Sequence, residues 1–284
     1  MSTVQAKPWL AQYPEGVGAE IDTNEFPSVA DVMRSAFSRF RHRPAFVNRG
    51  KVLSYEDLDR LSLAFACYLR NQLRLSKGDR VALMMPNVLQ YPVALMGILR
   101  AGLTVVNTNP MYTARELKHQ LNDAGAAAIV VMENFAHTLQ EVIGETPVKH
   151  VITTCVGDML GFPMAQIVNF VVKYQKKLVK PFSLPGAVRF NDALSAGRGQ
   201  QLPPTEIGPE DLAFLQYTGG TTGVSKGAML THRNMVANML QVRNWFGPHV
   251  QDGSEIIITA LPLYHIFALT CNCLVFMNVG GLNV

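Results

Sequence analysis

The chain has 284 residues, of which 48% are hydrophobic and 16% charged, and its formal net charge at pH 7 is +4. This composition is too apolar for an intrinsically disordered protein, and the length allows one large domain or two ordinary ones. Nucleic-acid-binding proteins concentrate more positive charge than this mild excess, so we expect no nucleic-acid partner.

The cysteines and the first residues favour a cytoplasmic protein. Only two of the four cysteines, Cys271 and Cys273, lie close together, and a Cys-x-Cys pair without a second pair or nearby histidines is a poor zinc site. We expect reduced thiols that serve as small core residues. The first twenty residues contain no continuous apolar stretch, so no secretory signal is predicted.

In chain order, residues 1–27 show little periodicity and predict an irregular arm. Apolar residues at helical spacing then predict a helix over 29–40, which a short strand from Pro44 follows. Ser54 and Asp57 resemble a capping box at the start of the next helix.

Strands and helices continue to alternate along the chain. We expect strands at 80–85, 103–106, 128–132 and 150–154, and helices at 91–101 and from Thr113 to Leu121. Strands separated by helices of this length imply βαβ units and an α/β fold with mostly parallel sheets.

The same pattern suggests two lobes. Residues 28–205 are predicted as a first α/β subdomain, and 206–284 as the start of a second one that is incomplete. The stretch 182–209, rich in Pro, Gly, Ser and Gln, is interpreted as the connector.

The end of the chain needs a test for a membrane span, because no Asp, Glu, Lys or Arg follows Glu255. The β-branched run from Ile256 to Thr259 is typical of a buried strand, and Asn272 and Asn278 would be costly within a bilayer. We therefore expect a buried strand, a loop and a core helix.

A glycine-rich loop follows a strand predicted at 211–217. The segment Tyr217–Gly227 reads YTGGTTGVSKG, with four glycines, four Thr or Ser residues and one lysine. Glycines let the backbone approach a ligand, successive N–H groups can bind an anion, and hydroxyl groups and Lys226 add donors and charge. This combination predicts a polyphosphate site. The order Ser225-Lys226-Gly227 excludes a Walker A loop, and Gly-x-Gly-x-x-Gly is absent as well.

The segment 217–234, YTGGTTGVSKGAMLTHRN, resembles the phosphate-binding signature of adenylate-forming enzymes. That superfamily includes acyl-CoA synthetases, luciferases and peptide-synthetase adenylation domains. Residues 261–268, LPLYHIFA, resemble the next family motif at the expected distance, and 53–58, 78–82 and 97–102 resemble earlier ones. The doubled glycine and the AMLTHRN continuation look most like bacterial long-chain fatty acyl-CoA synthetases.

The resemblance implies ATP-dependent activation of a fatty acid through acyl-AMP, followed by thioester formation with coenzyme A, and it implies Mg²⁺ as a cofactor. Lys226 and the loop residues would bind the β- and γ-phosphates; the loop residues are Thr218, Gly219, Gly220, Thr221, Thr222 and Gly223. The Thr218 hydroxyl is the candidate near Mg²⁺. His265 would lie close to the reacting carboxylate and α-phosphate. His232 is interpreted as structural, and for Tyr264 and Phe267 a pocket role and a core role stay open.

Family members carry later motifs that bind adenine, ribose and magnesium, and a small mobile domain with a catalytic lysine. None of these motifs occurs in this sequence. We therefore expect the amino-terminal portion of such a ligase, inactive by itself. Another adenylate-forming enzyme and a non-catalytic ATP- or lipid-binding remnant stay open as alternatives, and homodimer formation is also left open.

Residues 162–180 form an amphipathic segment, which we expect to be one helix that ends at Pro181. Four lysines lie on one face and five apolar residues on the other: Lys173, Lys176, Lys177 and Lys180 against Met164, Ile167, Val168, Val171 and Leu178. Two interpretations are open, an ordinary surface helix and peripheral contact with the inner face of a membrane.

Overall fold

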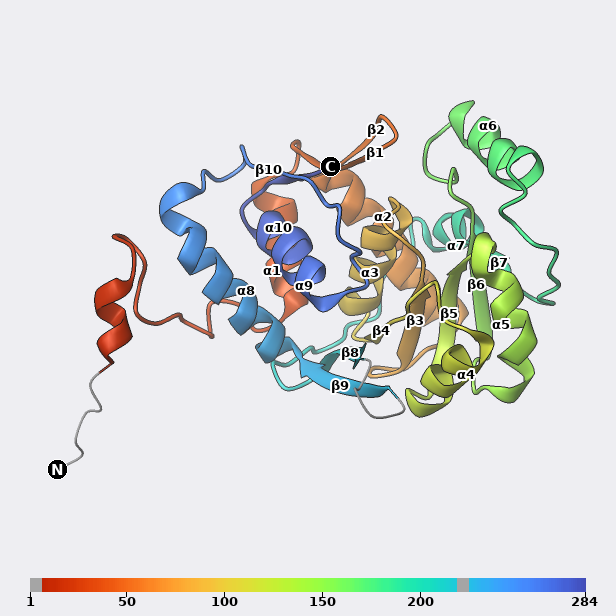
Figure 1. Ribbon diagram of the computed structural model, residues 1–284, viewed down its shortest axis with the longest axis horizontal. Helices are drawn as coiled ribbons and strands as arrows, with labels where there is room; N and C mark the ends of the chain where they lie inside the picture. The colour runs from red at the N-terminus through yellow and green to blue at the C-terminus, as the bar shows by residue number, and fades with distance from the viewer. Residues whose placement is uncertain (1–6, 219–224) are drawn as a thin grey trace.

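The computed structural model describes residues 7–218 and 225–284 (Figure 1). Its helices are α1 Val29–Arg39, α2 Tyr55–Cys67, α3 Gln90–Arg100, α4 Ala114–Asp123, α5 Ala136–Val142, α6 Met164–Phe170, α7 Phe190–Gly197, α8 His232–Phe246, α9 Ile266–Ala268 and α10 Phe276–Asn278. Its strands are β1 Pro44–Asn48, β2 Lys51–Ser54, β3 Arg80–Met84, β4 Thr104–Asn107, β5 Ala126–Met132, β6 His150–Thr154, β7 Val188–Arg189, β8 Leu212–Thr218, β9 Lys226–Thr231, β10 Ile256–Ile257 and β11 Leu282–Asn283.

Two sheets organise these strands. The larger one has the order β7-β6-β5-β3-β4-β8-β9, and only the β8–β9 pair at its edge is antiparallel. The smaller one has the order β10-β11-β1-β2, with an antiparallel β1–β2 hairpin and parallel pairs elsewhere. The predicted α/β class with mostly parallel sheets is confirmed.

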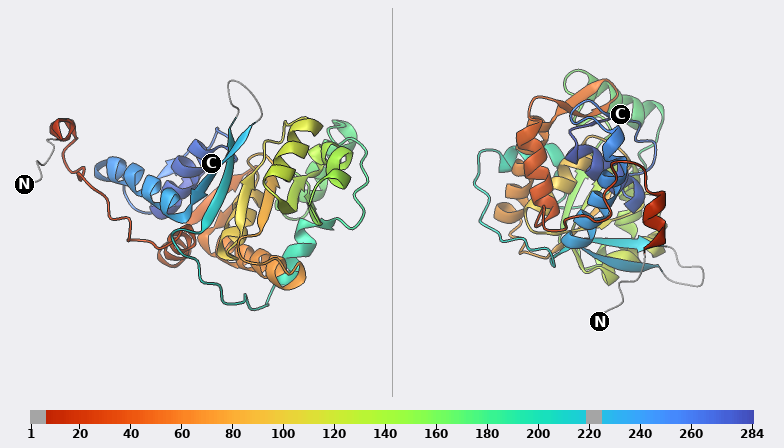
Figure 2. Two further views of the ribbon diagram at one scale, coloured as in Figure 1. Left: turned by 90° about the horizontal axis from the view of Figure 1, so that it is seen from below. Right: turned by 90° about the vertical axis from the view of Figure 1, so that its left-hand side faces the viewer.

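Helices cover both faces of the seven-stranded sheet (Figure 2). Val81 and Leu83 of β3 point into the core shared with α1, α2, α3 and α7, whereas Ala82 and Met84 point into the core under α4 and α5. A strand buried on both faces reads as a continuous apolar run, as β3 does.

The predicted helix starts are confirmed in detail. Ser54 and Asp57 form a capping box at α2, and Thr113 forms one with Glu116 at α4. In each box the N-cap hydroxyl accepts from a backbone N–H that has no partner within the helix, while the acidic residue accepts from the N-cap backbone.

Strand pairing crosses the boundary predicted between residues 205 and 206. Strand β8 pairs in parallel with β4, with Val105 opposite Phe214, so the larger sheet contains strands from both predicted subdomains. The predicted connector 182–209 also contains structure, namely β7 and α7. Phe190, Ala193 and Leu194 bury the inner face of α7, a short pattern that the surrounding Pro, Gly and Ser residues obscure.

Two predictions about apolar segments need correction. The run from Ile256 is not a buried strand: β10 has two residues at a sheet edge, and Ile256 and Ile258 are 65% and 77% exposed. The helix expected to reach Pro181 stops after a π-helical turn at Val171–Gln175, because Lys177 adopts a left-handed conformation with φ 52°. The expected core helix exists as α9 and α10 with a π-helical segment between them.

Among the helices within residues 7–218 and 225–284, none is long and apolar enough to cross a membrane. The four cysteines are free thiols, of which Cys67 and Cys273 are buried as expected and Cys155 and Cys271 are partly exposed.

His232 links the start of α8 to the start of α1. The residue is 1% exposed, and its Nδ1 accepts a hydrogen bond of 3.2 Å from the backbone N–H of Val29. Burial lowers the pKa of His232 to about 4, so the imidazole is neutral at pH 7. This contact supports the structural interpretation of His232.

We predict that this histidine makes the fold sensitive to acid. An unfolded histidine, with a pKa near 6.5, binds a proton before the folded one does. The contribution of the neutral His232 to the free energy of unfolding is therefore complete above about pH 6.5. It is lost as the pH falls towards about 4, and the free energy of unfolding then decreases by up to about 1.4 kcal/mol per pH unit. Urea unfolding across this range should show a weaker pH dependence in His232→Asn, which keeps an acceptor for Val29. The exposed His249→Asn is the control, and equal pH dependence in both variants would contradict the assignment.

Candidate functional site

A cavity of about 1080 Å³ opens at the carboxyl ends of β4 and β8. Ligands in open α/β sheets bind outside the carboxyl ends of the strands. The described lining residues are Asn107, Asn109, Tyr112, Thr113, Arg115, Glu116, His119, Gln216, Tyr217, Thr218, Ser225, Tyr264, His265 and Ile266.

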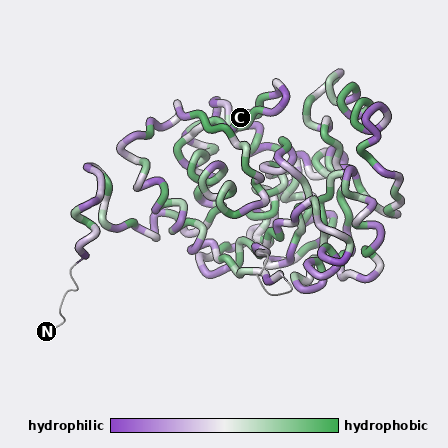
Figure 3. Tube along the Cα trace, in the orientation of Figure 1, coloured by the Kyte–Doolittle hydropathy of each residue, from purple (hydrophilic) through white to green (hydrophobic). Residues whose placement is uncertain are grey.

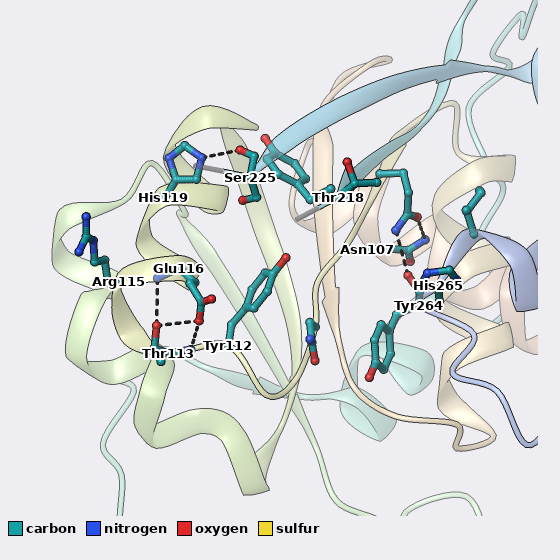
Figure 4. Close-up of a pocket in the computed structure, with 14 residues that line it drawn as sticks. Asn107, Tyr112, Thr113, Arg115, Glu116, His119, Thr218, Ser225, Tyr264 and His265 are labelled. Atoms are coloured by element: carbon teal, nitrogen blue, oxygen red, sulfur yellow. Dashed lines mark hydrogen bonds between the residues drawn. The ribbon is translucent and has the colours of Figure 1, made fainter. Parts of the chain in front are cut away.

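Three parts of the chain form the walls (Figure 4). Helix α4 and the segment before it lie on one side, Tyr264 and His265 lie on the opposite side, and Thr218 and Ser225 lie at the ends of the glycine-rich loop. The cavity thus brings together segments separated by more than 100 residues in the sequence.

The structure places the predicted site residues as follows. Thr218 ends β8 and lines the cavity, as does the exposed His265 that precedes α9. Lys226 is the first residue of β9, pairs with Thr218, is exposed, and is not among the described lining residues. The predicted phosphate-binding residues Gly219, Gly220, Thr221, Thr222 and Gly223 lie outside the described residues.

Helix α4 holds both ends of the glycine-rich loop. The Tyr217 hydroxyl donates to Asp123 Oδ2 at 2.5 Å, and His119 Nε2 lies 2.9 Å from the carbonyl oxygen of Ser225. Because a carbonyl oxygen can only accept, Nε2 must carry the hydrogen of this imidazole. Burial, followed by the hydrogen bond to the Asp123 carboxylate, raises the pKa of Tyr217, so this side chain stays a neutral donor.

Charge at the rim suits an anion. Arg115 on the first turn of α4 is exposed and lines the cavity. Glu116 is the one carboxylate among the described lining residues, and its Oε2 already accepts from the backbone N–H and hydroxyl of Thr113, at 2.8 and 2.7 Å. These bonds lower the pKa of Glu116 and make its charge part of the helix cap.

Sequence reasoning missed several lining residues. Arg115, His119 and Gln216 belong to none of the family motifs or candidate site residues recognised in the sequence. Asn107 and Gln216 lie near the carboxyl ends of adjacent parallel strands. Ligands in open α/β sheets bind at such ends, so both residues become site candidates once the pairing of β4 with β8 is known. Tyr264 lines the cavity, whereas Phe267 is 57% exposed.

The chain belongs to the AMP-binding enzyme family, because the model of that family matches residues 33–284. It is 57% identical over 278 residues to the long-chain-fatty-acid–CoA ligase of Escherichia coli O6:H1, covering 98% of this chain and 50% of that protein. It is 54% identical over 275 residues to the ligase of the same name from Yersinia pestis, covering 97% and 49%. The chain therefore spans about half the length of the curated relatives it matches.

Solved structures agree on the fold. The crystal structure of a long-chain-fatty-acid–CoA ligase from Archaeoglobus fulgidus superimposes with a TM-score of 0.74 at 24% identity, covering 96% of this chain and 49% of that chain. A red-emitting luciferase from Phrixothrix hirtus gives a TM-score of 0.72 at 20% identity, covering 91% and 46%.

We predict that Gly227→Ala destabilises the base of the loop. A Cβ at this position would lie 2.9 Å from two ring atoms of Tyr217, and the bond to Asp123 prevents that ring from swinging away freely. Overpacking of this kind costs about 1–3 kcal/mol of unfolding free energy, measured by urea titration. Gly208→Ala is the control, since its Cβ would meet only Asp211 Oδ2 at 3.8 Å. Equal stability of the two variants would show that the tyrosine is not held.

Proposed function

We propose that this chain carries the phosphate- and acyl-binding part of a long-chain fatty acid–CoA ligase. The observation that carries the proposal is the cavity that joins Thr218 at the start of the glycine-rich loop to His265. The 57% identity to the ligase of Escherichia coli supplies the substrate class.

The proposed reaction has two steps. A carboxylate oxygen of the fatty acid attacks the α-phosphorus of ATP, the bond from that phosphorus to the bridging oxygen breaks, and pyrophosphate leaves with the electron pair. The coenzyme A thiolate then attacks the carbonyl carbon of acyl-AMP and displaces AMP. Because two anions must meet in the first step, positioning and charge neutralisation dominate the demands on the site.

Each wall of the cavity has a role in this proposal. The glycine-rich loop, from Thr218 to Lys226, binds the β- and γ-phosphates, and Arg115 adds positive charge at the rim. His265, on the opposite wall, faces the place where carboxylate and α-phosphate meet. An imidazole N–H at this point can donate to an oxygen that gains charge.

The residues present fit Mg²⁺ held mainly by ATP. Magnesium prefers oxygen ligands and usually keeps several waters beside substrate phosphates. The Thr218 hydroxyl is such an oxygen at the cavity wall, while the Glu116 carboxylate is engaged in the α4 cap. The ion would supply charge neutralisation between the phosphates, and this chain would contribute the Thr218 hydroxyl.

We also propose that residues 162–180 contact an anionic membrane surface, where a long-chain fatty acid is concentrated. The segment around α6 projects from the body and carries hydrophobic residues (Figures 1 and 3). Six large apolar side chains of this segment are 46–87% exposed: Phe162, Met164, Ile167, Phe170, Tyr174 and Leu178. Four exposed lysines follow the same segment: Lys173, Lys176, Lys177 and Lys180. Apolar side chains beside lysines are typical of interfacial segments.

We predict that Lys226→Ala weakens ATP binding by about 10–100-fold, because a charge-assisted contact to phosphate is lost. Isothermal titration of the 284-residue chain with Mg·ATP measures the effect, and Lys51→Ala, an exposed lysine on β2, is the control. An oleoyl-sulfamoyl-adenosine, which lacks the β- and γ-phosphates, should bind both variants equally. Loss of both ligands in Lys226→Ala would contradict the assignment to the terminal phosphates.

The same ligand series tests the substrate class. The oleoyl compound should bind at least about tenfold more tightly than its amino-acyl counterpart, since the acyl chain buries apolar surface. The reverse order would favour an amino-acid-activating enzyme. Oleate-dependent ATP–pyrophosphate exchange then separates a catalytic chain from one that only binds nucleotide.

We predict that Ile167→Asn reduces binding to vesicles of phosphatidylcholine and phosphatidylglycerol by about fivefold or more, because apolar surface no longer enters the bilayer. Ile258→Asn changes an isoleucine elsewhere that is more exposed, 77% against 51% for Ile167, and should have no effect. Vesicle co-sedimentation measures both, and vesicles of phosphatidylcholine alone should bind the unmodified chain more weakly. Equal binding of the two variants would identify α6 as an ordinary surface helix.

A further inference from the structure

The segment 259–265, which carries His265, owes its position to side chains of other elements. It connects β10 to α9 and contains no helix or strand of its own. Asn87 binds it at three points: Nδ2 donates to the carbonyls of Thr259 and Leu261, both at 2.9 Å, and Oδ1 accepts from the N–H of Leu263 at 2.8 Å. The start of the segment is thus tied to the loop that follows β3.

Its end is held by a ring of buried hydrogen bonds. Gln216 Nε2 donates to the carbonyl of Tyr264 at 3.2 Å, and Asn107 Nδ2 donates to Gln216 Oε1 at 3.0 Å. The Tyr91 hydroxyl closes the ring: it lies 2.7 Å from Asn107 Oδ1 and 2.9 Å from the carbonyl oxygen of Leu263, and it donates its one hydrogen to either of these two acceptors. The three side chains are 0–6% exposed.

The orientation of this ring follows from its chemistry. The carbonyl of Tyr264 can only accept, so Gln216 must turn its amide nitrogen towards it and its oxygen towards Asn107. Asn107 then donates to Gln216 and presents its own oxygen to Tyr91. Gln120 fixes the backbone of Asn107 from α4, with Nε2 2.9 Å from its carbonyl oxygen. Gln216 and Asn107 therefore each have a single amide orientation that matches the Tyr264 carbonyl and each other.

Gln216 occupies the position where this ring meets the phosphate site. It lies two residues before Thr218 on β8, and it binds the residue directly before His265. Both Gln216 and Asn107 also line the cavity. One side chain thus bridges the strand that enters the glycine-rich loop and the segment that carries the histidine.

We propose that Gln216, oriented by Asn107, is a positioning residue that couples the phosphate loop to His265. Through its bond to the Tyr264 carbonyl it sets where the histidine lies relative to Thr218, and occupation of the phosphate loop tightens the 259–265 segment through the same bond. The coupling to the phosphate loop rests on the proposed ATP site, whereas the positioning of His265 by Gln216 does not.

Isosteric substitutions test the proposal. Gln216→Glu keeps the size and the acceptor for Asn107 but, when ionised, replaces the donor by an oxygen that repels the Tyr264 carbonyl. Gln90→Glu is the matched control, because Gln90 is a buried amide that donates to the carbonyl of Cys155 at 2.7 Å, outside the cavity. Both variants place a carboxylate at a position where a buried amide donates a hydrogen bond to a carbonyl oxygen. A general loss of stability should therefore affect both variants alike.

Amide hydrogen exchange of the 284-residue chain, followed by mass spectrometry, gives the readout. Without nucleotide, Gln216→Glu should speed exchange in the peptide 259–268 by about fivefold or more relative to Gln90→Glu. Mg·ATP should slow exchange in this peptide severalfold in the unmodified chain and in Gln90→Glu, but not in Gln216→Glu. Lowering the pH should restore the effect in Gln216→Glu, since a protonated carboxyl regains a donor.

The outcomes separate the two proposals. Equal exchange of the peptide 259–268 in Gln216→Glu and Gln90→Glu without nucleotide overturns the positioning role. An ATP effect that persists in Gln216→Glu at a pH at which its carboxyl is ionised overturns the coupling. Absence of any ATP effect in the unmodified chain refutes the proposed nucleotide site instead, and the nucleotide-free comparison still decides whether Gln216 holds the segment. If Gln216→Glu does not fold, Asn107→Asp removes the donor that orients Gln216 and gives the same comparison.

Discussion

The parallel pairing of β4 with β8 is the contact on which the candidate site depends. It aligns Val105, Val106 and Asn107 with Phe214, Leu215 and Gln216, across more than 100 residues of sequence. Because parallel strands end at the same edge, the pairing sets the start of the glycine-rich loop beside the segment that follows β4. The hydrogen bond between Asn107 and Gln216 and the cavity between α4 and His265 both require this register. A shift by one residue would turn Gln216 to the opposite face of the sheet.

Polar side chains then fasten two irregular segments to this edge. Asp123 and His119 of α4 hold the two ends of the glycine-rich loop, and Asn87, Tyr91 and Gln216 hold the 259–265 segment. Buried polar groups are costly unless they are paired, so side chains that satisfy one another in a single arrangement specify that arrangement strongly. The proposed site would bring two anions together, and walls held in this way suit that task, since the donors need no rearrangement when charge develops.

The segment 162–180 around α6, in contrast, is not held by buried side chains. None of its helical residues is buried, and its larger apolar side chains face solvent. Burial cannot explain why such residues stand there, and contact with a surface outside the protein is the proposal that fits both the apolar residues and the lysines. The periodicity correctly indicated a helix but overestimated its length, so that Lys176, Lys177 and Lys180 lie beyond its end. The left-handed turn at Lys177 is a local backbone choice that no apolar pattern records.

The sequence by itself determined much of the local structure and predicted a polyphosphate ligand for the glycine-rich loop. Apolar periodicity located the helices and strands, Ser54 and Thr113 marked two helix starts, and the glycines, hydroxyls and Lys226 indicated a polyphosphate ligand. Short-range rules suffice there because capping, periodicity and anion binding involve residues close in sequence. Tertiary structure alone decided that β8 joins the first sheet, that 182–209 contains α7, and that Ile256 and Ile258 lie at an exposed edge. It also chose Gln216 and Asn107 as partners, because strand order and burial depend on pairings between distant segments that no local pattern encodes.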